Sequence, residues 1–428
     1  MTATPASGPV PGPAPGRGSG STLNLSRLLR RPLTARDGQS LGRLCDVIVR
    51  LRGAGYPLVT GLVGKVGGRQ VYVPIEQVSS FDAEELKLTS ARLNLRRFER
   101  RDGEVLLRAD LLGHRLIDVA SVRLVRAADL QLARHDAEWV LAGVDTGRRS
   151  GRVLGLLGLG RRRGQGVFRD QGQFEALIGH SASAVLRGPF ARIRGLKPAQ
   201  IADLLEDASK AEETEILGRV HADPELEADV FEELDEDLAS RLLGARSDQE
   251  VAEVLSRMRA DDAADAIEEL PQQRREAVLD LLPPGQRDKV LTLMGFNPTS
   301  AGGLMGMDFL ALPSATAVGE VLAAVRQAVS LQPEALTSVH AIDERGRLAG
   351  VARLVTLLQA DPGDRLIEVS DRDPVRVGTD ADVVDVAVLM TDYNLITIPV
   401  VDERCGLLGL ITVDDVLEVA LPEDWRRP

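Results

Sequence analysis

Between residues 229 and 294, apolar pairs return every twelve residues. The pairs are Val230-Phe231, Leu242-Leu243, Val254-Leu255, Ala266-Ile267, Val278-Leu279 and Val290-Leu291. Another apolar residue follows four positions after the first member of each pair, except at Arg246. Because positions i, i+1 and i+4 share one face of an α-helix, each repeat predicts a short amphipathic helix. Helices this short cannot bury that face alone, so we expect them to stack as a superhelix.

Residues that favour helix starts stand at the boundaries of this repeat. Ser247-Asp-Gln-Glu250 is a capping-box pattern, in which the serine and glutamate side chains bind free backbone N–H groups. Asp261-Asp262 places negative charge at a helix N-terminus. Pro271 and Pro283-Pro284 suit a first helical turn. The repeat therefore predicts separate helices with short connections.

A second duplication lies nearer the C-terminus. Residues Ala341–Val351 match Val400–Leu410 at a constant offset of 59. Each copy reads as a strand, a turn at Asp-Glu-Arg and a second strand. An amphipathic segment precedes each copy, at Val318–Ala328 and Val383–Thr391, and another follows it. The pattern predicts a tandem β-α-β-β-α module.

The N-terminal half has short apolar runs separated by glycine, which is typical of small β-barrels. The expected strands are Leu44–Leu51, Gln70–Ile75, Val105–Ala109, Arg115–Val119, Val122–Val125 and Glu138–Asp145. Two stretches, Gly42-Arg-Leu-Cys-Asp-Val and Gly113-His-Arg-Leu-Ile-Asp-Val, share a Gly…Asp-Val core. This match indicates a duplicated β unit.

Charge divides the chain near residue 200. The first 200 residues contain 32 Lys and Arg against 17 Asp and Glu, and the remainder contains 20 against 47. The acidic part repels itself unless something neutralises it. The candidates are the basic half of the same chain, a basic partner or bound cations.

Composition excludes several classes of protein. Cys45 and Cys405 lie far apart in the sequence, so they build neither a disulfide framework nor a zinc site, and the chain reads as cytosolic. The longest apolar stretches, such as Val153–Leu159, fall far short of the ~20 residues of a membrane helix. The Pro- and Gly-rich segment 1–21 lacks the apolar core of a signal peptide and reads as a disordered tail.

Other chemistry has little support. The five histidines are scattered, and neither a nucleophile motif nor a phosphate-binding glycine loop is present, so we do not expect an enzyme. Arg161–Arg163 would suit a phospholipid or nucleic acid, but such a run is more often a solvated loop. Few aromatic side chains lie near it, so nucleic-acid binding is not expected.

The tandem module resembles a pair of CBS domains. The segments that extend this resemblance are Asp261-Asp-Ala-Ala-Asp-Ala-Ile-Glu-Glu-Leu270, Ser300-Ala-Gly-Gly-Leu-Met305 and Asp308-Phe-Leu-Ala-Leu312. Residues 196–421 thus resemble the cytosolic part of MgtE-type magnesium transporters, in which an acidic superhelical N domain precedes a CBS pair. The β-rich half resembles PRC-barrel domains. A membrane domain follows the CBS pair in those transporters. This chain ends at Pro428, so we expect no transport domain.

The expected fold is multidomain α+β. The N-terminal half is β-barrel-like, the middle is an all-α superhelix of short helices, and a tandem β-α-β-β-α CBS pair follows. The expected boundaries are a tail at 1–22, PRC-barrel-like domains at 23–110 and 111–195, the acidic superhelix at 196–300, the CBS pair at 301–421 and a tail at 422–428. The Arg- and Gly-rich loop belongs to the second barrel.

The resemblance implies Mg²⁺ bound between the acidic superhelix and the CBS pair. The acids that match family ligand positions are Asp229, Asp261, Asp265, Asp382, Asp415, Glu418 and Glu423. Two further family acids are replaced, by Val384 and Asn394. Asp261 and Asp265 stand one helical turn apart, as do Asp414 and Glu418, and a hard divalent ion would relieve their repulsion. The alternative interpretation is that these carboxylates are solvated helix faces.

CBS pairs also often bind adenine nucleotides through a Thr/Ser-x-x-Asp motif. The second unit has it as Thr412-Val-Asp-Asp415, where the resemblance implies that Asp415 holds ribose hydroxyls and Thr412 a phosphate. The first unit has Arg353-Leu-Val-Thr356 instead. Asp415 is a candidate for both ligands, and a purely structural role for the motif is the alternative.

The favoured hypothesis is a soluble cytosolic regulatory protein that senses Mg²⁺ and reports by changing the angle between superhelix and CBS pair. The alternatives are a PRC-barrel/CBS interaction scaffold, or an adenine-nucleotide-sensing subunit without specific metal binding. The resemblance also implies a homodimer through the CBS pair. A membrane transporter is the expected partner of the basic half, which would place the protein at the membrane periphery.

Overall fold

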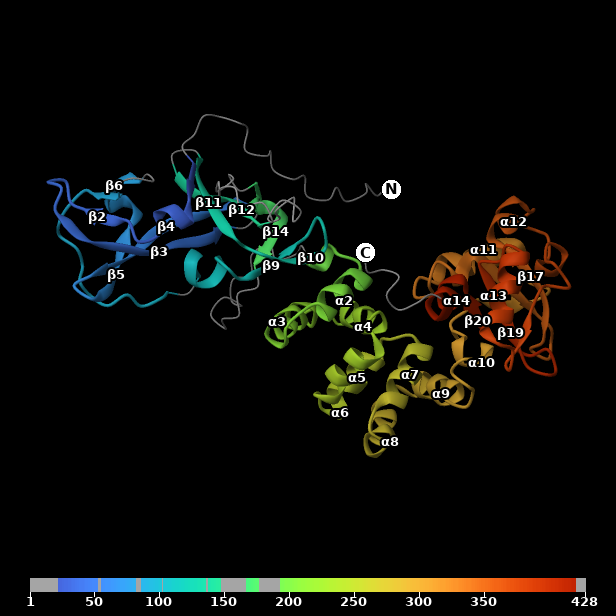
Figure 1. Cartoon of the computed structure of the whole chain (residues 1–428). Coiled ribbons are helices and arrows are strands. Elements are labelled where there is room, and N and C mark those ends of the chain that lie inside the picture. Colours follow the sequence, from blue (N-terminus) through green and yellow to red (C-terminus); the bar gives the residue numbers. More distant parts are fainter. Residues whose placement is uncertain are drawn as a thin grey trace, which may run out of the picture. The chain divides into compact units, whose positions relative to one another are not determined.

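The structure is a computed structural model that describes residues 22–52, 55–81, 86–101, 103–135, 138–147, 167–176 and 193–420. The chain forms two compact units, Met1–Leu226 and Glu227–Pro428. Figure 1 shows strands in the first unit, helices α2 to α9 in the middle of the chain, and a mixed α/β region at the C-terminal end. This is the multidomain α+β fold that the sequence predicts.

Among its described residues, the first unit is built on one sheet of eleven strands. Its order is β1-β11-β12-β4-β3-β2-β7-β6, with β5 beside β4, β8 beside β3 and β13 beside β12. The bounds are β1 (Thr22–Asn24), β2 (Pro32–Thr34), β3 (Ser40–Arg52), β4 (Gly55–Val66), β5 (Arg69–Pro74), β6 (Val78–Phe81), β7 (Leu86–Leu88), β8 (Glu104–Leu106), β11 (Asp129–His135), β12 (Glu138–Asp145) and β13 (Phe168–Asp170). A smaller sheet holds β9 (Arg115–Asp118) between β10 (Arg123–Arg126) and β14 (Phe174–Ala176). Leucine and valine dominate the core of this unit.

Five of the six expected strands are confirmed, and one is shorter than expected. Of the segment Val105–Ala109, only Val105 and Leu106 belong to a strand, β8 (Glu104–Leu106), and Leu107–Leu111 forms a π-helical turn. The carboxylate of Asp46 accepts hydrogen bonds from Arg108 N (2.7 Å) and Ala109 N (3.0 Å). A side chain thus satisfies the backbone groups that a strand partner would otherwise bind, and the ladder ends there.

The duplication in this unit has a different register from the expected one. Asp46 binds the turn Leu107–Leu111, and Asp129 binds Ser26 in helix α1 (Leu25–Leu28) through the backbone N (3.0 Å) and Oγ (2.5 Å). Strands pair in the same reciprocal way, β8 with β3 and β1 with β11. Asp46 therefore corresponds to Asp129, and not to Asp118 as the Gly…Asp-Val match indicates. Strands on both sides of residue 110 share one sheet, and the boundary between two barrel domains stays a prediction.

Helices α2 (Pro198–Glu206) and α3 (Lys210–Val220) begin the acidic part of the chain and belong to the first unit. Arg115 on β9 forms ion pairs with Asp207 and with Glu212 (3.2 Å). Arg219 on α3 forms another with Glu175 on β14. Arg115 of the basic half therefore pairs with two acids at the start of the superhelix, and Arg219 of the acidic half pairs with an acid of the basic half.

The twelve-residue repeat is confirmed as a stack of short helices. After α4 (Pro224–Glu232) come α5 (Glu236–Gly244), α6 (Asp248–Leu255), α7 (Ala260–Glu269), α8 (Gln272–Leu281) and α9 (Pro284–Leu293), whose first residues stand twelve apart. Alternate helices pack together, α5 on α7, α6 on α8 and α7 on α9. The predicted capping box is present, with Ser247 N donating to Glu250 Oε2 (2.9 Å) and Glu250 N to Ser247 Oγ (3.3 Å).

Arg246, the one polar residue in the apolar series, has its own place in the packing. Its guanidinium lies over the ring of Phe231 at 4.7 Å and binds the buried carboxylate of Glu227 at 2.7 Å. The side chain covers an aromatic face as an apolar residue would, while its charge compensates a buried acid.

The tandem β-α-β-β-α module is confirmed in both copies. The first comprises β15 (Ala311–Pro313), α11 (Val318–Gln327), β16 (Ser338–Ile342), β17 (Leu348–Arg353) and α12 (Leu354–Gln359). The second comprises β18 (Val377–Gly378), α13 (Val383–Asp392), β19 (Thr397–Val401), β20 (Leu407–Thr412) and α14 (Val413–Ala420). Contacts between the copies are reciprocal, because Leu348 N donates to Cys405 O (2.8 Å) and Leu407 N to Gly346 O (3.5 Å).

Helix α10 (Ala301–Leu304) joins the superhelix to the second CBS unit. Gly302 N donates to Thr379 O (2.8 Å), and Ala301 N to Ala381 O (2.9 Å). A Cβ atom at Gly303 would collide with the carbonyl oxygen of Asn297, which explains a glycine in this motif. The connection places the end of the superhelix beside β18.

Within the described part of the chain, no helix is both long enough and apolar enough to span a membrane. Several expectations lie outside the described residues, namely the tail 1–21, the Arg161–Arg163 loop and Glu423. The side chain of Glu418 is likewise not described.

Candidate functional site

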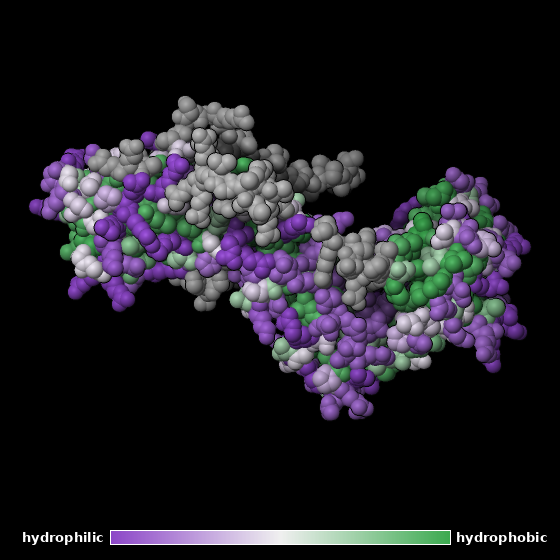
Figure 2. All heavy atoms as spheres, viewed as in Figure 1, coloured by the Kyte–Doolittle hydropathy of each residue, from purple (hydrophilic) through white to green (hydrophobic). Residues whose placement is uncertain are grey.

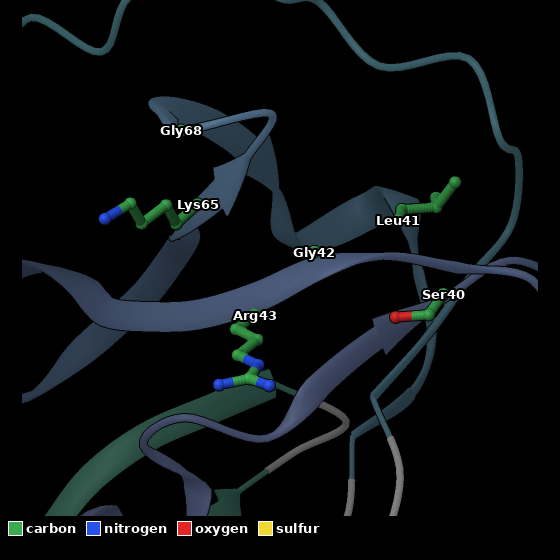
Figure 3. Close-up of a pocket in the computed structure, with 6 residues that line it drawn as sticks. All are labelled: Ser40, Leu41, Gly42, Arg43, Lys65 and Gly68. Atoms are coloured by element: carbon green, nitrogen blue, oxygen red, sulfur yellow. The ribbon is translucent and has the colours of Figure 1, made fainter.

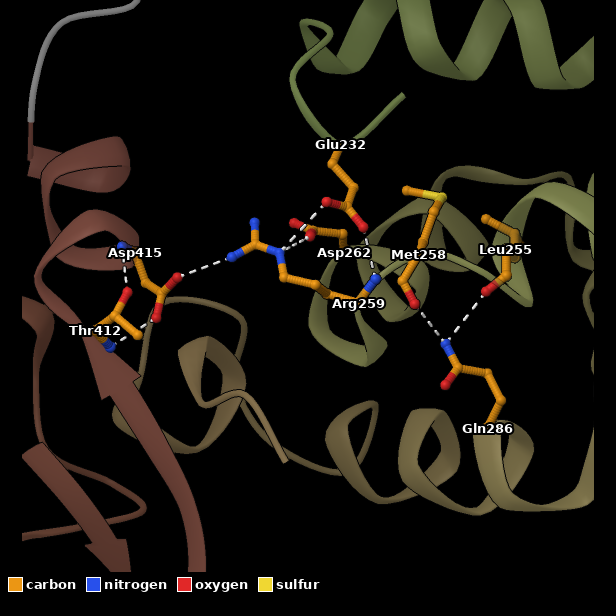
Figure 4. A network of polar contacts seen from close by, with 8 residues as sticks. All are labelled: Glu232, Leu255, Met258, Arg259, Asp262, Gln286, Thr412 and Asp415. Carbon is orange, nitrogen blue, oxygen red and sulfur yellow. Dashed lines mark hydrogen bonds and ion pairs between the residues drawn. The ribbon is translucent and has the colours of Figure 1, made fainter. Parts of the chain in front are cut away.

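The candidate site lies where the start of α7 meets the start of α14. Arg259 is the residue before α7, and its guanidinium reaches three carboxylates (Figure 4). Nε lies 2.7 Å from Oδ2 of Asp262 and 3.6 Å from Oε2 of Glu232, both on the superhelix. Nη1 lies 3.1 Å from Oδ1 of Asp415, at the start of α14 in the second CBS unit. One side chain thus links the superhelix to the CBS pair.

Asp415 is buried, and both of its oxygens are engaged. Oδ2 accepts a hydrogen bond from Thr412 N (2.7 Å), and Asp415 N donates to Thr412 Oγ1 (3.4 Å). Thr412-Val-Asp-Asp415 therefore works as the capping box of α14. The motif thus has a structural role, which is to cap helix α14.

Asp261, in the first turn of α7, is buried as well, and its Oδ1 has no hydrogen-bond partner among the described residues. Burial raises the pKa of this carboxyl group, the nearby charge of Arg259 lowers it, and the charge of Asp415 raises it again. A buried carboxylate oxygen without a donor costs free energy, so this atom needs an explanation.

Glu232, the last residue of α4, completes the network. Its Oε1 accepts a hydrogen bond from Arg259 N at 2.7 Å. Burial raises the pKa of Glu232 to about 7, against the lowering effect of Arg259, and the charges of Asp229 and Asp261 add to the increase. The pKa of Arg259 is in turn raised by the carboxylates around it, which outweigh the lowering effect of burial.

The structure brings together part of the predicted ligand set. Asp261 and Asp415 lie within electrostatic reach of each other, and Asp229 lies within reach of Glu232. Asp265 is exposed on α7. Asp382 is exposed too, and its Oδ1 caps α13 by accepting a hydrogen bond from Val384 N (2.8 Å). Among the described residues, no three or more His, Cys, Asp or Glu side chains are grouped to hold a metal ion.

Three members of the network, Glu232, Arg259 and Asp262, were absent from the predicted site. One signal for Arg259 exists in the sequence. It occupies the position that precedes a helix in the twelve-residue repeat, where the two previous repeats have Asp235 and Ser247. The next two repeats have Pro271 and Pro283 at that position, so Arg259 is the one cation in the series.

The donors present fit a magnesium ion. Mg²⁺ prefers oxygen ligands, keeps several waters and is usually bound through only one or two carboxylates. Asp261 supplies a carboxylate oxygen without a donor, and Asp415 supplies a second carboxylate from the CBS pair. The two residues would hold such an ion together with water.

A shallow pocket in the first unit does not form a comparable binding site. It is lined by Ser40, Leu41, Gly42, Arg43, Lys65 and Gly68. Arg43 and Lys65 stand opposite each other in the β3–β4 ladder, but Figure 3 shows their side chains extending apart. They do not converge on one anion.

A superhelix of short helices joined to two β-α-β-β-α units defines a protein of the helical-domain-plus-CBS-pair class. Residues 196–299 match the MgtE intracellular N domain, and residues 366–421 match the CBS domain. The chain is similar to the solved cytosolic domain of the Mg²⁺ channel MgtE in complex with ATP, with 31% identity and a TM-score of 0.50, over 53% of this chain and 92% of that one. The chain therefore belongs to the MgtE family.

Curated relatives point to the same family. The magnesium transporter MgtE of Thermus thermophilus is 40% identical over 162 residues, which cover 37% of this chain and 36% of that protein. The magnesium transporter MgtE of Bacillus subtilis is 23% identical over 195 residues, 46% of this chain and 43% of that protein. The chain spans less than half the length of these relatives. The likeness of residues 23–195 to PRC-barrel domains stays a prediction.

Proposed function

We propose that this chain is a cytosolic regulatory module that binds Mg²⁺ between its superhelix and its second CBS unit, and that binding changes the relation of the two. One observation carries the proposal. The buried Oδ1 of Asp261 has no hydrogen-bond partner in the described residues, and it belongs to a carboxylate near Asp415 of the CBS unit. The family relationship supports the choice of ion, because the relatives are magnesium transporters.

Charge at the site supports a cation. Four carboxylates, those of Glu232, Asp261, Asp262 and Asp415, surround the single guanidinium of Arg259. The network therefore carries excess negative charge at neutral pH, even with Glu232 partly protonated. A bound divalent ion would supply two positive charges and accept the orphan oxygen of Asp261 as a ligand.

The conformational part of the proposal follows from the position of the acids. Asp261 belongs to the superhelix and Asp415 to the CBS pair. A ligand that binds both carboxylates favours arrangements in which they are close, and it shifts the population by its differential affinity for those arrangements. Magnesium binding would thus change the angle between the superhelix and the CBS pair at α10.

Calorimetry on the full chain tests metal binding. We expect Mg²⁺ to bind with a millimolar or tighter dissociation constant, and Asp261→Asn to weaken binding at least tenfold, since it removes a charged ligand. Asp237→Asn is the matched control, because Asp237 is an exposed acid on α5 of the same superhelix. Small-angle scattering should show compaction with Mg²⁺ for the wild type and the control. Absence of binding in all three proteins would overturn the proposal.

Adenine-nucleotide binding is a second candidate function. A solved relative is described in complex with ATP, and Thr412 and Asp415 carry the motif that the sequence predicts. The capping box and Arg259 already engage Asp415, however, so nucleotide would compete with both. We expect ATP to bind more weakly to Asp415→Asn than to the wild type. Equal affinities would leave the motif with its structural role.

We also propose association through the CBS pair. Apolar side chains are exposed on its helices, among them Leu358 on α12 (64%), Val388 on α13 (51%) and Leu417 on α14 (45%). Figure 2 shows this apolar surface on the CBS pair, in the region where Figure 1 draws α11, α12 and α14. A second copy of the chain would cover it. Light scattering after size exclusion should give a dimer for the wild type and a monomer for Val388→Asp.

The relatives suggest a transporter as the partner that the module regulates, docked through the basic N-terminal half. An interaction scaffold without metal binding is the competing function. Partner capture that is identical with and without a chelator, together with no calorimetric response to Mg²⁺, would favour the scaffold.

A further inference from the structure

Arg259 is an unexpected residue at the start of a helix. The residues before α5, α6 and α7 are Asp235, Ser247 and Arg259, spaced by twelve. Asp235 accepts a hydrogen bond from Leu238 N (2.8 Å), and Ser247 accepts one from Glu250 N (3.3 Å). Arginine has no acceptor atom and brings positive charge to the positive end of the helix dipole, so it stabilises this start less than either. Proline precedes the next two helices, α8 and α9, so Arg259 is the one cation in this series, and its role lies in the contacts of its side chain.

The contacts of Arg259 show that role. Nε faces the superhelix acids Asp262 and Glu232, and Nη1 faces Asp415 of the CBS pair (Figure 4). The guanidinium therefore joins the same two parts of the chain that the proposed Mg²⁺ would join. It also lies near enough to Asp261 to lower the pKa of that carboxyl group.

We propose that Arg259 is a built-in cation that holds the superhelix against the second CBS unit without metal and competes with Mg²⁺ for Asp261 and Asp415. Arg259 thereby sets the magnesium concentration at which the site responds. The proposal rests on the proposed function and adds its regulation.

The competition follows from charge and tethering. The guanidinium is ionised at every physiological pH and is covalently held at the site, so it is always present at high local concentration. Its single charge does not balance the carboxylates around it, whereas a divalent ion brings two charges. Metal binding therefore includes the cost of separating Arg259 from Asp415, and every 1.4 kcal/mol of that cost raises the dissociation constant tenfold.

Two measurements on the full chain with Arg259→Gln test the proposal. Calorimetry with MgCl₂ should give a dissociation constant about tenfold lower than that of the wild type, because the competing cation is gone. Small-angle scattering without metal should give a larger radius of gyration than the metal-free wild type, and Mg²⁺ should compact the variant to the radius of the magnesium-bound wild type. Arg326→Gln, an exposed arginine on α11, makes the same change of net charge and should behave as wild type.

The Arg259→Lys variant tests the same proposal if Arg259→Gln does not fold. It keeps the charge but not the planar fork, so its magnesium affinity should lie between those of the wild type and Arg259→Gln. Thermal unfolding of each variant, followed by circular dichroism, shows whether it is folded.

The possible failures are distinguishable. If neither the wild type nor Arg259→Gln binds Mg²⁺, the proposed function is wrong. If both bind Mg²⁺ with the same affinity and have the same metal-free radius of gyration, the proposed function stands and the role of Arg259 is overturned.

Discussion

Nη1 of Arg259 lies 3.1 Å from Oδ1 of Asp415, which joins residues 156 positions apart in the chain. Arg259 precedes helix α7 of the superhelix, and Asp415 opens helix α14 of the second CBS unit. The pair is partly buried, so its charges are less screened than those of a surface ion pair. It is the polar link that a bridging ion would replace.

Asp415→Asn should destabilise the protein by about 1–3 kcal/mol, since it leaves Arg259 without its CBS partner and weakens the capping box of α14. Urea unfolding of the full chain measures the loss. Asp414→Asn, which alters the exposed neighbour on the same helix, is the control and should unfold at the wild-type urea concentration. A double-mutant cycle with Arg259→Gln should show coupling, and strictly additive losses would contradict a direct interaction.

Glu232 should make stability depend on pH near neutrality. Burial raises its pKa in the folded state to about 7 from an ordinary value of 4.5. Above pH 4.5 the unfolded chain releases this proton while the folded protein retains it. Stability therefore falls as pH rises from about 4.5 to about 7, by at most about 3 kcal/mol, and then levels off.

Glu232→Gln tests this dependence, because glutamine keeps the carbonyl acceptor for Arg259 N but cannot ionise. The unfolding free energy of the variant should exceed that of the wild type increasingly between pH 4.5 and pH 7. A constant difference over this range would show that Glu232 titrates normally in the folded protein.

His340 should destabilise the CBS pair in acid. The side chain is fully buried on β16, and its Nε2 has no hydrogen-bond partner among the described residues. Burial lowers its pKa from 6.5 to about 4. Below pH 6.5 the unfolded state binds a proton that the folded state does not bind. Stability is therefore full above pH 6.5. It is lost as pH falls toward 4, by up to about 3 kcal/mol.

His340→Leu fills a similar space and has no titratable group. Its unfolding temperature should fall less than that of the wild type between pH 6.5 and pH 4. Parallel curves for wild type and His340→Leu would contradict the assignment.

Arg246→Leu restores the apolar repeat in the sequence, yet we expect it to destabilise the protein by about 2–4 kcal/mol. The substitution removes the guanidinium from the Phe231 ring and from the buried Glu227 carboxylate. Replacing Glu227 by Gln in the same protein should recover part of the loss, since the buried charge is then absent. Chemical denaturation of the single and double variants measures both effects.

Sequence patterns predicted the elements that repeat at fixed spacing. The helices α5 to α9 begin twelve residues apart, and the paired CBS strands stand 59 residues apart, as the sequence indicates. Such patterns are local, because a period of apolar residues shows which face a helix or strand must bury. The π-helical turn at Leu107–Leu111 escaped prediction because a distant side chain, that of Asp46, binds its backbone.

The candidate site was predictable in part. Asp261 and Asp415 were predicted through a family resemblance, and they lie within electrostatic reach of each other in the structure. Asp265 and Asp382 have the same residue type, but both are exposed, and the second caps a helix. Sequence spacing cannot separate these cases, because burial depends on which helices pack across the chain.

The sequence by itself determined the repeated helices, the duplicated CBS unit and the family. Each of these depends on residues that are neighbours in the chain or recur at a fixed spacing. Only the tertiary structure decided that Arg259 lies among Glu232, Asp262 and Asp415, that Asp46 binds the Leu107–Leu111 turn and that Asp129 binds Ser26. These pairings depend on how the helices and strands stack, and the free energy of a charge depends on what surrounds it after stacking.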